Sequence, residues 1–262
     1  MKLCLERTGA GPPLVLWHGW GLNLRVFDEL RAALAADFEI FAIDLPGHGR
    51  SPWSVGMDGE AQLSALLQQL PERAALLGWS LGGQFALRAA LRAPQKLRRL
   101  ILVSTTPRFT SAPDWPHGLE SAVLGEFARR LREDWSGTVR DFLELQVRGA
   151  SGWVLALAAL QAALTAHGRG DPAALAAGLE LLAHTDLRSQ LPALRTPTLL
   201  ICGERDRITP AAASRALAQA LPQAHCLALA RAAHTPFLTD PAAVASAVRE
   251  FLRPQAAEQD LA

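Results

Sequence analysis

The sequence has only three cysteines and a formal net charge of +1, and both shortages exclude classes of protein. The cysteines are widely spaced and odd in number, and Cys202 lies in an expected core strand, which argues against a disulfide framework or a metal site. We therefore expect free thiols. The small net charge argues against nucleic-acid binding. The chain also lacks a glycine-rich phosphate loop, a Cys/His ligand cluster and a dinucleotide fingerprint, so we expect no cofactor and no metal.

One uncharged segment, residues 149–168, is about long enough to span a bilayer. Polar residues such as Gln161 and Thr165 stand among its many alanines, so we interpret it as a cap helix buried against the core and expect no membrane association. At the amino terminus, Lys2 and Arg7 place charges where a signal peptide needs an apolar stretch. We expect a cytoplasmic protein.

The alternation of strand-like and helical segments predicts an α/β fold. At 262 residues and 50% hydrophobic, the chain can bury one large core. Five strand-like runs separated by helical segments indicate βαβ units and a mainly parallel central sheet flanked by helices. These runs are residues 14–17, 38–43, 74–77, 100–104 and 198–202. Because such sheets bind ligands at the carboxyl ends of their strands, functional residues are expected in the loops there.

Strand signals disappear in the middle of the chain, where helical periodicity replaces them. We therefore expect an α/β core formed by residues 1–107 and 191–262, with an inserted helical cap of residues 108–190. No internal repeat or low-complexity linker interrupts either part.

Local signals place two helices. A glycine-rich turn precedes Asp171 and Pro172, which suit the N-cap and the first position of a helix in the second half of the cap. A terminal helix is expected from about Pro241 to Leu252, and the polar tail from Pro254 onward is expected to fray.

Residues 76–83, Leu-Leu-Gly-Trp-Ser-Leu-Gly-Gly, hold a Gly-x-Ser-x-Gly pattern between an apolar run and a helical segment. A serine at the tip of a sharp strand-to-helix turn has a strained backbone, and its neighbours must be nearly free of side chain. Gly78 and Gly82 meet that need, which makes Ser80 the candidate nucleophile. Three such positions also recur by chance in purely structural turns, so the context has to supply the partners.

A serine hydroxyl needs a base that accepts its proton and a carboxylate that orients the base. With this kind of turn the chain order is serine, then acid, then histidine. Asp206 follows the expected strand at 198–202 and is the candidate acid. His234 follows the short apolar run 226–229 and precedes the terminal helix, so it is the candidate base.

Other residues of the same types compete for these roles. Glu204 is a rival carboxylate, which we interpret as a solvated loop residue because Asp206 lies at the far end of the loop. The remaining histidines fit neither the order nor the context: His18, His48, His117, His167, His184 and His225.

Attack on an ester carbonyl creates an oxyanion, which main-chain amides stabilise in this kind of site. Leu81, directly after the nucleophile, is expected to supply one amide. The strand at 14–17 ends in a His-Gly-Trp-Gly loop, where Trp20 is expected to supply the second. The two glycines of that loop also suit an ordinary turn, and both interpretations hold together because the same turn aims the amide.

Five motifs together resemble α/β-hydrolases of the lipase and esterase kind: residues 18–21, 44–51, 78–83, 203–206 and 233–237. Within that superfamily, the Gly-Trp-Ser-Leu-Gly-Gly and His-Gly-Trp-Gly motifs resemble the BioH family, the pimeloyl-[acyl-carrier protein] methyl ester esterases of biotin synthesis. Segments of the middle region are similar to that family's cap: residues 114–116, 142–146, 178–182 and 186–188. The resemblance implies an α/β-hydrolase fold with an inserted cap and a serine carboxylesterase activity.

The resemblance also implies which residues bind the substrate. Trp20 and Leu81 would contact the acyl chain or ester beside Ser80 and His234, together with a five-residue segment of the cap. This segment consists of Phe142, Leu143, Glu144, Leu145 and Gln146. An ordinary amphipathic cap helix would give the same pattern, and both interpretations hold if one helix face lines the tunnel.

An acyl-carrier protein is the partner that the resemblance implies, besides small-molecule esters, and we expect a monomer. An acidic carrier needs a basic face, for which the cap offers Arg129, Arg130, Arg132, Arg140 and Arg148. Five acidic residues are interleaved with them, so a mixed solvated surface is an equal interpretation: Glu126, Glu133, Asp134, Asp141 and Glu144. Gly137 and Asp141 stand where the family's cap arginines would be expected, which leaves the docking mode open.

Two alternatives to a carrier-dependent esterase remain. A generalist short-chain carboxylesterase would have the same site under a cap that does not recognise a carrier. A non-catalytic ligand-binding α/β-hydrolase is the other, and a complete set of serine, acid and histidine argues against it because a receptor does not need all three.

Overall fold

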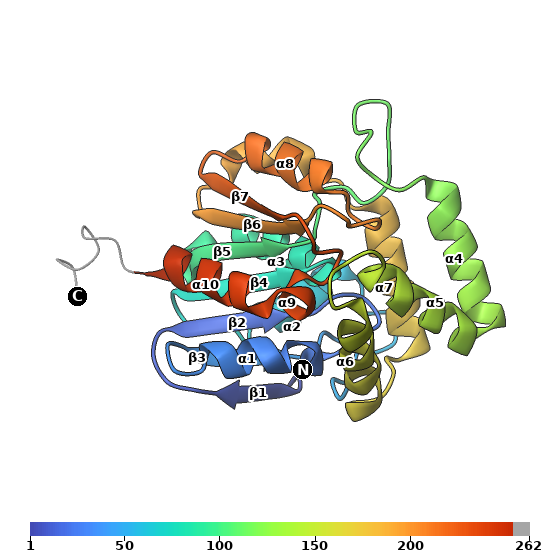
Figure 1. Ribbon diagram of the computed structural model, residues 1–262, viewed down its shortest axis with the longest axis horizontal. Helices are drawn as coiled ribbons and strands as arrows, with labels where there is room; N and C mark the ends of the chain where they lie inside the picture. The colour runs from blue at the N-terminus through green and yellow to red at the C-terminus, as the bar shows by residue number, and fades with distance from the viewer. Residues whose placement is uncertain (254–262) are drawn as a thin grey trace.

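The computed structural model describes residues 1–253, which form a seven-stranded sheet with helices on both faces (Figure 1). The strands are β1 (Leu5–Thr8), β2 (Pro13–Trp17), β3 (Glu39–Ile43), β4 (Ala74–Trp79), β5 (Leu97–Val103), β6 (Thr198–Gly203) and β7 (Ala224–Leu229). They lie in the order β1-β3-β2-β4-β5-β6-β7. Only β1 pairs antiparallel, with β3, so the prediction of a mainly parallel sheet is confirmed.

The sequence pattern missed two strands, β1 and β7, which are the two edge strands of the sheet. Strand β1 is four residues long and only half-buried, with charged Glu6 and Arg7 in its middle, and β7 has no fully buried residue. An edge strand with one partner needs no continuous apolar run, because its outer side faces solvent. The strands that the pattern did predict are the buried ones, such as β4, whose six residues are all buried.

Two layers of helices cover the sheet (Figure 1). Helices α1 (Asp28–Leu34), α9 (Pro236–Thr239) and α10 (Pro241–Leu252) pack together on one face. Helices α2 (Gly59–Leu67), α3 (Leu81–Arg92) and α8 (Ala211–Ala220) contribute to the core on the other face. Short 3-10 turns are η1 (Leu24–Phe27), η2 (Pro94–Lys96) and η3 (Arg188–Ala193). The predicted terminal helix is confirmed as α10, while the predicted frayed tail from Pro254 lies outside the described residues.

Four helices of the middle region lie beyond the carboxyl ends of the strands, on the right of Figure 1. They are α4 (Ser121–Glu133), α5 (Trp135–Val147), α6 (Trp153–Ala166) and α7 (Pro172–His184), and we call them the cap. The predicted start of α7 is confirmed: the Asp171 side chain accepts hydrogen bonds from the amides of Ala173 and Ala174, and Pro172 occupies the first helical position.

Helix α6 corrects one expectation about residues 149–168. Only one face of α6 is buried, through Ala156, Leu160 and Ala163. Near its amino-terminal end the large apolar side chains are exposed, and Leu155 is 79% accessible. The segment is therefore a surface helix with one packed face. Among the described residues, no helix is both long and apolar enough to cross a membrane.

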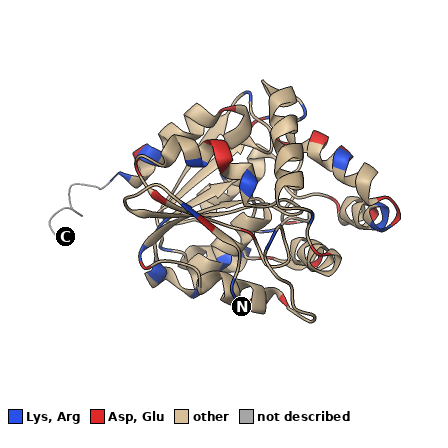
Figure 2. Cartoon of the chain, turned by 90° about the horizontal axis from the view of Figure 1, so that it is seen from below, with Lys and Arg blue, Asp and Glu red and all other residues tan. Residues whose placement is uncertain are grey.

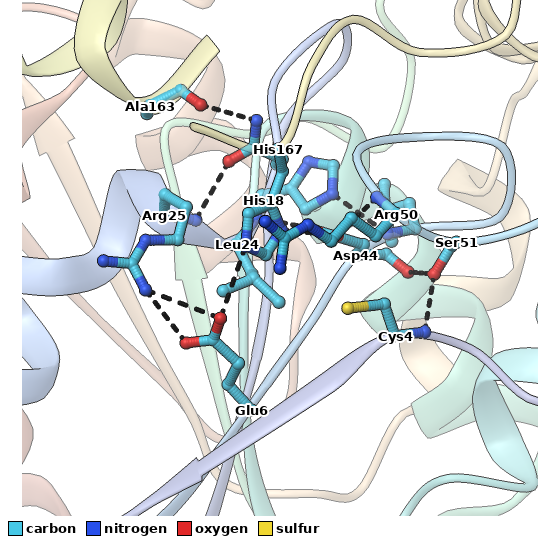
Figure 3. A network of polar contacts seen from close by, with 12 residues as sticks. Cys4, Glu6, His18, Leu24, Arg25, Asp44, Arg50, Ser51, Ala163 and His167 are labelled. Atoms are coloured by element: carbon cyan, nitrogen blue, oxygen red, sulfur yellow. Dashed lines mark hydrogen bonds and ion pairs between the residues drawn. The ribbon is translucent and has the colours of Figure 1, made fainter. Parts of the chain in front are cut away.

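A polar network ties the cap to the sheet (Figure 3). Asp44, at the end of β3, accepts hydrogen bonds from the amides of Leu24 and Arg50, at 2.7 and 2.8 Å. His167, just after α6, places Nδ1 2.9 Å from the same carboxylate and Nε2 3.3 Å from Glu6 Oε1. Potential metal ligands of Cys4, Asp44 and His167 lie within 4.8 Å of one another. Because donors already occupy the Asp44 oxygens, we assign this cluster a structural role.

Candidate active site

Ser80 lies in the turn between β4 and α3 with φ 55° and ψ −118°, a conformation that residues with side chains rarely adopt. A Cβ on Gly78 would lie 2.4 Å from the carbonyl oxygen of Gly82, and a Cβ on Gly82 would lie 2.3 Å from that of Trp17. Both positions therefore exclude any larger residue. The sharp strand-to-helix turn that the Gly-x-Ser-x-Gly pattern predicts is present in the structure.

Three loops bring the candidate nucleophile, base and acid together. His234 Nε2 lies 3.1 Å from Ser80 Oγ, and His234 Nδ1 lies 2.8 Å from Asp206 Oδ2. Ser80 follows β4, Asp206 follows β6 and His234 follows β7. Because these strands are parallel, all three residues lie beyond the carboxyl ends of the strands. The side chains are shielded from water, since the three residues are 9%, 6% and 1% accessible. This arrangement can move a proton from the serine to the imidazole and stabilise the resulting cation.

The orientation of the Asp206 carboxylate depends on residues that follow it. The amides of Ile208 and Thr209 donate to Oδ1, at 2.8 and 2.9 Å, and the Thr209 hydroxyl donates to Oδ2 at 2.8 Å. The sequence reasoning did not identify Thr209. An aspartate followed three residues later by a threonine in a loop is the available signal, because such residues bond back to the carboxylate. Glu204, the rival acid, is exposed and forms an ion pair with Arg215.

The loop that carries His234 is held from two sides. The main-chain N–H of His234 donates to the carbonyl oxygen of Gln146 in the cap at 2.9 Å. The main-chain carbonyl oxygen of His234 accepts from Trp79 Nε1 at 2.9 Å. Trp79 is the residue directly before Ser80, so the loops that carry the candidate nucleophile and the candidate base are held against each other. These contacts were not foreseen from the sequence, since they join residues 88 and 155 positions apart in the chain.

Above Ser80 lies an apolar cavity. Its walls include Trp20, Phe109, Phe127, Phe142, Leu145 and Ile208. The rings of Trp20, Phe127 and Phe142 meet with centroids 5.3 to 5.6 Å apart. The indole N–H of Trp20 donates a hydrogen bond to the Leu175 carbonyl oxygen at 2.8 Å. The ring of Trp20 therefore presents an apolar surface to the cavity. A ligand with an apolar chain fits such a wall.

Only part of the segment 142–146 faces this cavity. Phe142 and Leu145 line it, as expected for positions three apart on one helix face. Leu143 is buried in the hydrophobic core on the other side, and Glu144 lies at the surface 3.9 Å from Arg148. Gln146 acts through the main-chain oxygen that accepts from His234. The periodicity of α5 therefore separates the five residues that the resemblance had grouped.

The two expected oxyanion donors lie beside the nucleophile. Leu81 is the first residue of α3, and no hydrogen bond engages its amide or that of Trp20 within residues 1–253. A Cβ on Gly19 would lie 3.2 Å from Ser80 Cβ, so the loop that carries Trp20 runs directly past the serine. Two free amides beside the nucleophile can donate hydrogen bonds to the negative charge that develops on a carbonyl oxygen.

His18 supports the Trp20 loop as a neutral side chain. Its Nδ1 lies 2.8 Å from the Gly19 carbonyl oxygen, and its Nε2 lies 2.9 Å from the amide of Leu45. Complete burial, and then the neighbouring His48, lowers the pKa of His18 to about 3. The neutral ring can donate at Nδ1 and accept at Nε2, which matches both contacts.

Comparison with known families places this geometry among enzymes. Residues 12–241 match the model of the alpha/beta hydrolase fold. A protein of Nitrosomonas europaea is 40% identical over 238 residues, which cover 90% of this chain and 94% of the relative. A protein of Stenotrophomonas maltophilia is 41% identical over 257 residues, with 95% of each chain covered. Both relatives carry the name pimeloyl-[acyl-carrier protein] methyl ester esterase.

Solved structures agree with the fold. An esterase from Exiguobacterium antarcticum superposes with a TM-score of 0.87 at 21% identity and covers 95% of each chain. A hydrolase from Pseudomonas aeruginosa superposes with a TM-score of 0.79 at 29% identity, with 95% of this chain and 94% of that chain covered.

Proposed function

Because the chain belongs to the alpha/beta hydrolase family and, within it, to the pimeloyl-[acyl-carrier protein] methyl ester esterases, we propose that it hydrolyses the methyl ester of a pimeloyl chain carried on acyl-carrier protein, in biotin synthesis. One observation carries this proposal. Ser80, His234 and Asp206 form a hydrogen-bonded chain that ends in the wall of a cavity able to hold an apolar acyl chain.

In the proposed reaction, Ser80 Oγ attacks the ester carbonyl carbon while His234 Nε2 takes its proton. Asp206 accepts from Nδ1–H of His234 and stabilises the imidazolium. The amides of Leu81 and Trp20 bind the oxyanion of the tetrahedral intermediate. His234 then returns the proton to the methoxy oxygen, the C–O bond breaks and methanol leaves. Water, deprotonated by His234, attacks the acyl-enzyme, releases the carboxylic acid and regenerates Ser80.

The character of the cavity favours an ester substrate and release of the acid product. No charged side chain is among the described residues that line the cavity. A methyl ester is neutral and enters at little cost, whereas a carboxylate without a cationic partner is expensive to bury. Hydrolysis therefore converts a group that suits the cavity into one that does not, which promotes product release.

Of the five cap arginines expected to bind the carrier, Arg129 and Arg130 are paired with carboxylates, whereas exposed Arg132 has no carboxylate within 4.0 Å among the described residues. Blue and red segments lie close together on the cap helices (Figure 2). Arg129 pairs with Glu126 at 2.7 Å and also contacts Glu133, while Arg130 pairs with Asp141 at 2.7 Å. Neutralised arginines attract an acidic partner weakly, so these residues support the alternative of a general carboxylesterase.

A second group of arginines suits an acidic carrier better. Arg205, Arg207 and Arg231 are exposed, and none of them lies within 4.0 Å of a carboxylate in the part of the chain that the structure describes. The Arg205 side chain donates to the Gly149 carbonyl oxygen, and the Arg231 carbonyl accepts from the amide of Ser151 at 2.9 Å. These contacts place both arginines against the loop between α5 and α6. We call Arg205, Arg207 and Arg231 the loop arginines.

The loop that carries Arg205 and Arg207 reaches the cavity, because Arg207 directly precedes Ile208 in the cavity wall. A carrier bound there would hold its acyl chain near the entrance to the site. We propose this patch as the carrier docking surface, with electrostatic attraction guiding the acidic partner.

Charge reversal at the loop arginines is expected to weaken binding of the carrier substrate alone. The double variant Arg207→Glu/Arg231→Glu should raise KM for the carrier substrate by roughly fivefold to tenfold, and the effect should shrink at high salt. Hydrolysis of a small ester should not change. The matched control is Arg73→Glu/Arg195→Glu, which makes the same charge change at exposed arginines just before β4 and β6. These arginines lie at the amino-terminal ends of the strands, opposite the candidate active site. Equal effects of both double variants would remove the docking assignment.

The proposed function is tested by comparing two substrates. We expect the wild-type protein to prefer the pimeloyl-carrier methyl ester over a small p-nitrophenyl ester by at least about tenfold in kcat/KM. Comparable or better turnover of the small ester would point to a general carboxylesterase instead. Failure to react with a serine-directed fluorophosphonate would point to a non-catalytic ligand-binding protein.

A further inference from the structure

Two thiols face the same side of the sheet on the neighbouring strands β6 and β7. The register pairs Leu200 with Cys226 and Cys202 with Ala228. Paired residues of parallel strands, and residues two apart along a strand, point to the same face, so Cys202 and Cys226 share one. Helix α8 packs against both strands there. Cys202 is fully buried, whereas Cys226 is exposed on β7 at the end of the sheet.

Charged and polar groups around Cys202 and Cys226 shift the pKa values of the two thiols in opposite directions. A hydrogen bond with Cys202 lowers the pKa of Cys226 to about 7, against the effect of partial burial, and the positive charge of Arg215 on α8 adds to the lowering. The negative charge of Glu204 opposes it. The same hydrogen bond, together with burial, raises the pKa of Cys202. Burial disfavours a charge on Cys202, so the buried thiol is suited to donate and the exposed sulfur of Cys226 is suited to carry the negative charge.

The third cysteine provides an internal contrast. Cys4 is partly buried beside the Asp44 carboxylate. Burial, and then the negative charge of Asp44, raises the pKa of Cys4 to about 11. Because the thiolate is the reactive form of cysteine, Cys4 is expected to stay inert at neutral pH, where about half of Cys226 is ionised.

We propose that Cys226 is a thiol-modification site for low-molecular-weight disulfides and related electrophiles, with buried Cys202 as the hydrogen-bond donor that stabilises its thiolate. The Cys226 thiolate attacks one sulfur of the small disulfide. A new S–S bond forms to Cys226, the original S–S bond breaks, and the second half leaves as a thiolate. The exchange is balanced without a further oxidant. This site uses none of the catalytic residues, so it stands independently of the proposed function.

Alkylation of the intact native protein tests the proposal. Iodoacetamide labelling, followed at each cysteine by peptide mass spectrometry across a range of pH, should give a midpoint near pH 7 for Cys226. Cys4 should label far more slowly at that pH, and Cys202 should be protected. Oxidised glutathione at neutral pH should leave a single adduct, on Cys226, that a reductant removes. Equal labelling of Cys226 and Cys4 at pH 7 would overturn the proposal.

Two substitutions at one position separate the role of the donor from packing. Cys202→Ala removes the hydrogen-bond donor and should move the Cys226 midpoint to about pH 8.5, the value of an ordinary thiol. Cys202→Ser keeps a donor of similar size and should retain a midpoint near that of the wild type. Should Cys202→Ala fail to fold, Arg215→Gln provides a second route, since loss of its charge should also raise the midpoint. An unchanged midpoint in a folded Cys202→Ala protein would contradict the assignment of Cys202 as the donor.

Discussion

The Ser80→Ala variant is expected to lose about 10⁶-fold in kcat for ester hydrolysis while it keeps its fold. The loss is large because His234 Nε2, 3.1 Å from Ser80 Oγ, would have no nucleophile to activate. What remains is attack by water on a substrate that the cavity and the two amides still bind. The measurement is single-turnover and steady-state hydrolysis of the same ester by both proteins.

Folding should survive this substitution. The Ser80 side chain does not cap α3, and the hydrogen bonds at this residue that hold the turn come from its main chain, including one from the Thr105 hydroxyl to the Ser80 carbonyl at 2.7 Å. Alanine tolerates the backbone of the turn about as well as serine, because both carry one Cβ. The melting temperature and the near-ultraviolet circular dichroism should therefore match the wild type.

Ser104→Ala is the matched control for Ser80→Ala. Ser104 is also buried with a positive φ, 43°, and follows β5, the strand next to β4. Its hydroxyl has no hydrogen-bond partner among the described residues. This control should hydrolyse esters at the wild-type rate. Substantial activity in a pure, folded Ser80→Ala protein would eliminate Ser80 as the nucleophile.

Asp206→Asn should lower kcat by about 10⁴-fold, the second-largest effect we expect. The amides of Ile208 and Thr209 both donate to Oδ1, so an asparagine must keep its carbonyl oxygen there. Its NH2 group then faces His234 Nδ1, where Asp206 Oδ2 lies at 2.8 Å in the wild type. A donor at that position favours the tautomer with the proton on Nε2, which cannot accept the proton of the serine.

Glu204→Gln is the control for Asp206→Asn. It makes the same chemical change two residues earlier in the same loop, at an exposed side chain that pairs with Arg215. We expect wild-type kcat in this variant. A loss in Glu204→Gln as large as in Asp206→Asn would show that the loop, rather than the orientation of His234, was disturbed.

Much of the fold followed from local chemistry in the sequence. The buried strands read as continuous apolar runs, and α7 and α10 begin at prolines that follow aspartate caps. The turn at Ser80 was equally readable, because its glycines meet backbone atoms of neighbouring segments at distances that no Cβ tolerates. A short local pattern with one steric cause can be recognised without knowing the rest of the structure.

The sequence by itself thus determined the five inner strands of the sheet, the nucleophile turn and the candidates Asp206 and His234. Only the tertiary structure decided that Thr209 and Gln146 hold those residues in place, and that the loop arginines have no carboxylate partner among the described residues while Arg129 and Arg130 are paired. The approach of Cys202 to Cys226 also depended on the register of β6 and β7. The reason is physical: side-chain periodicity and turn chemistry act over a few residues, whereas these contacts join segments that only the packed fold brings together.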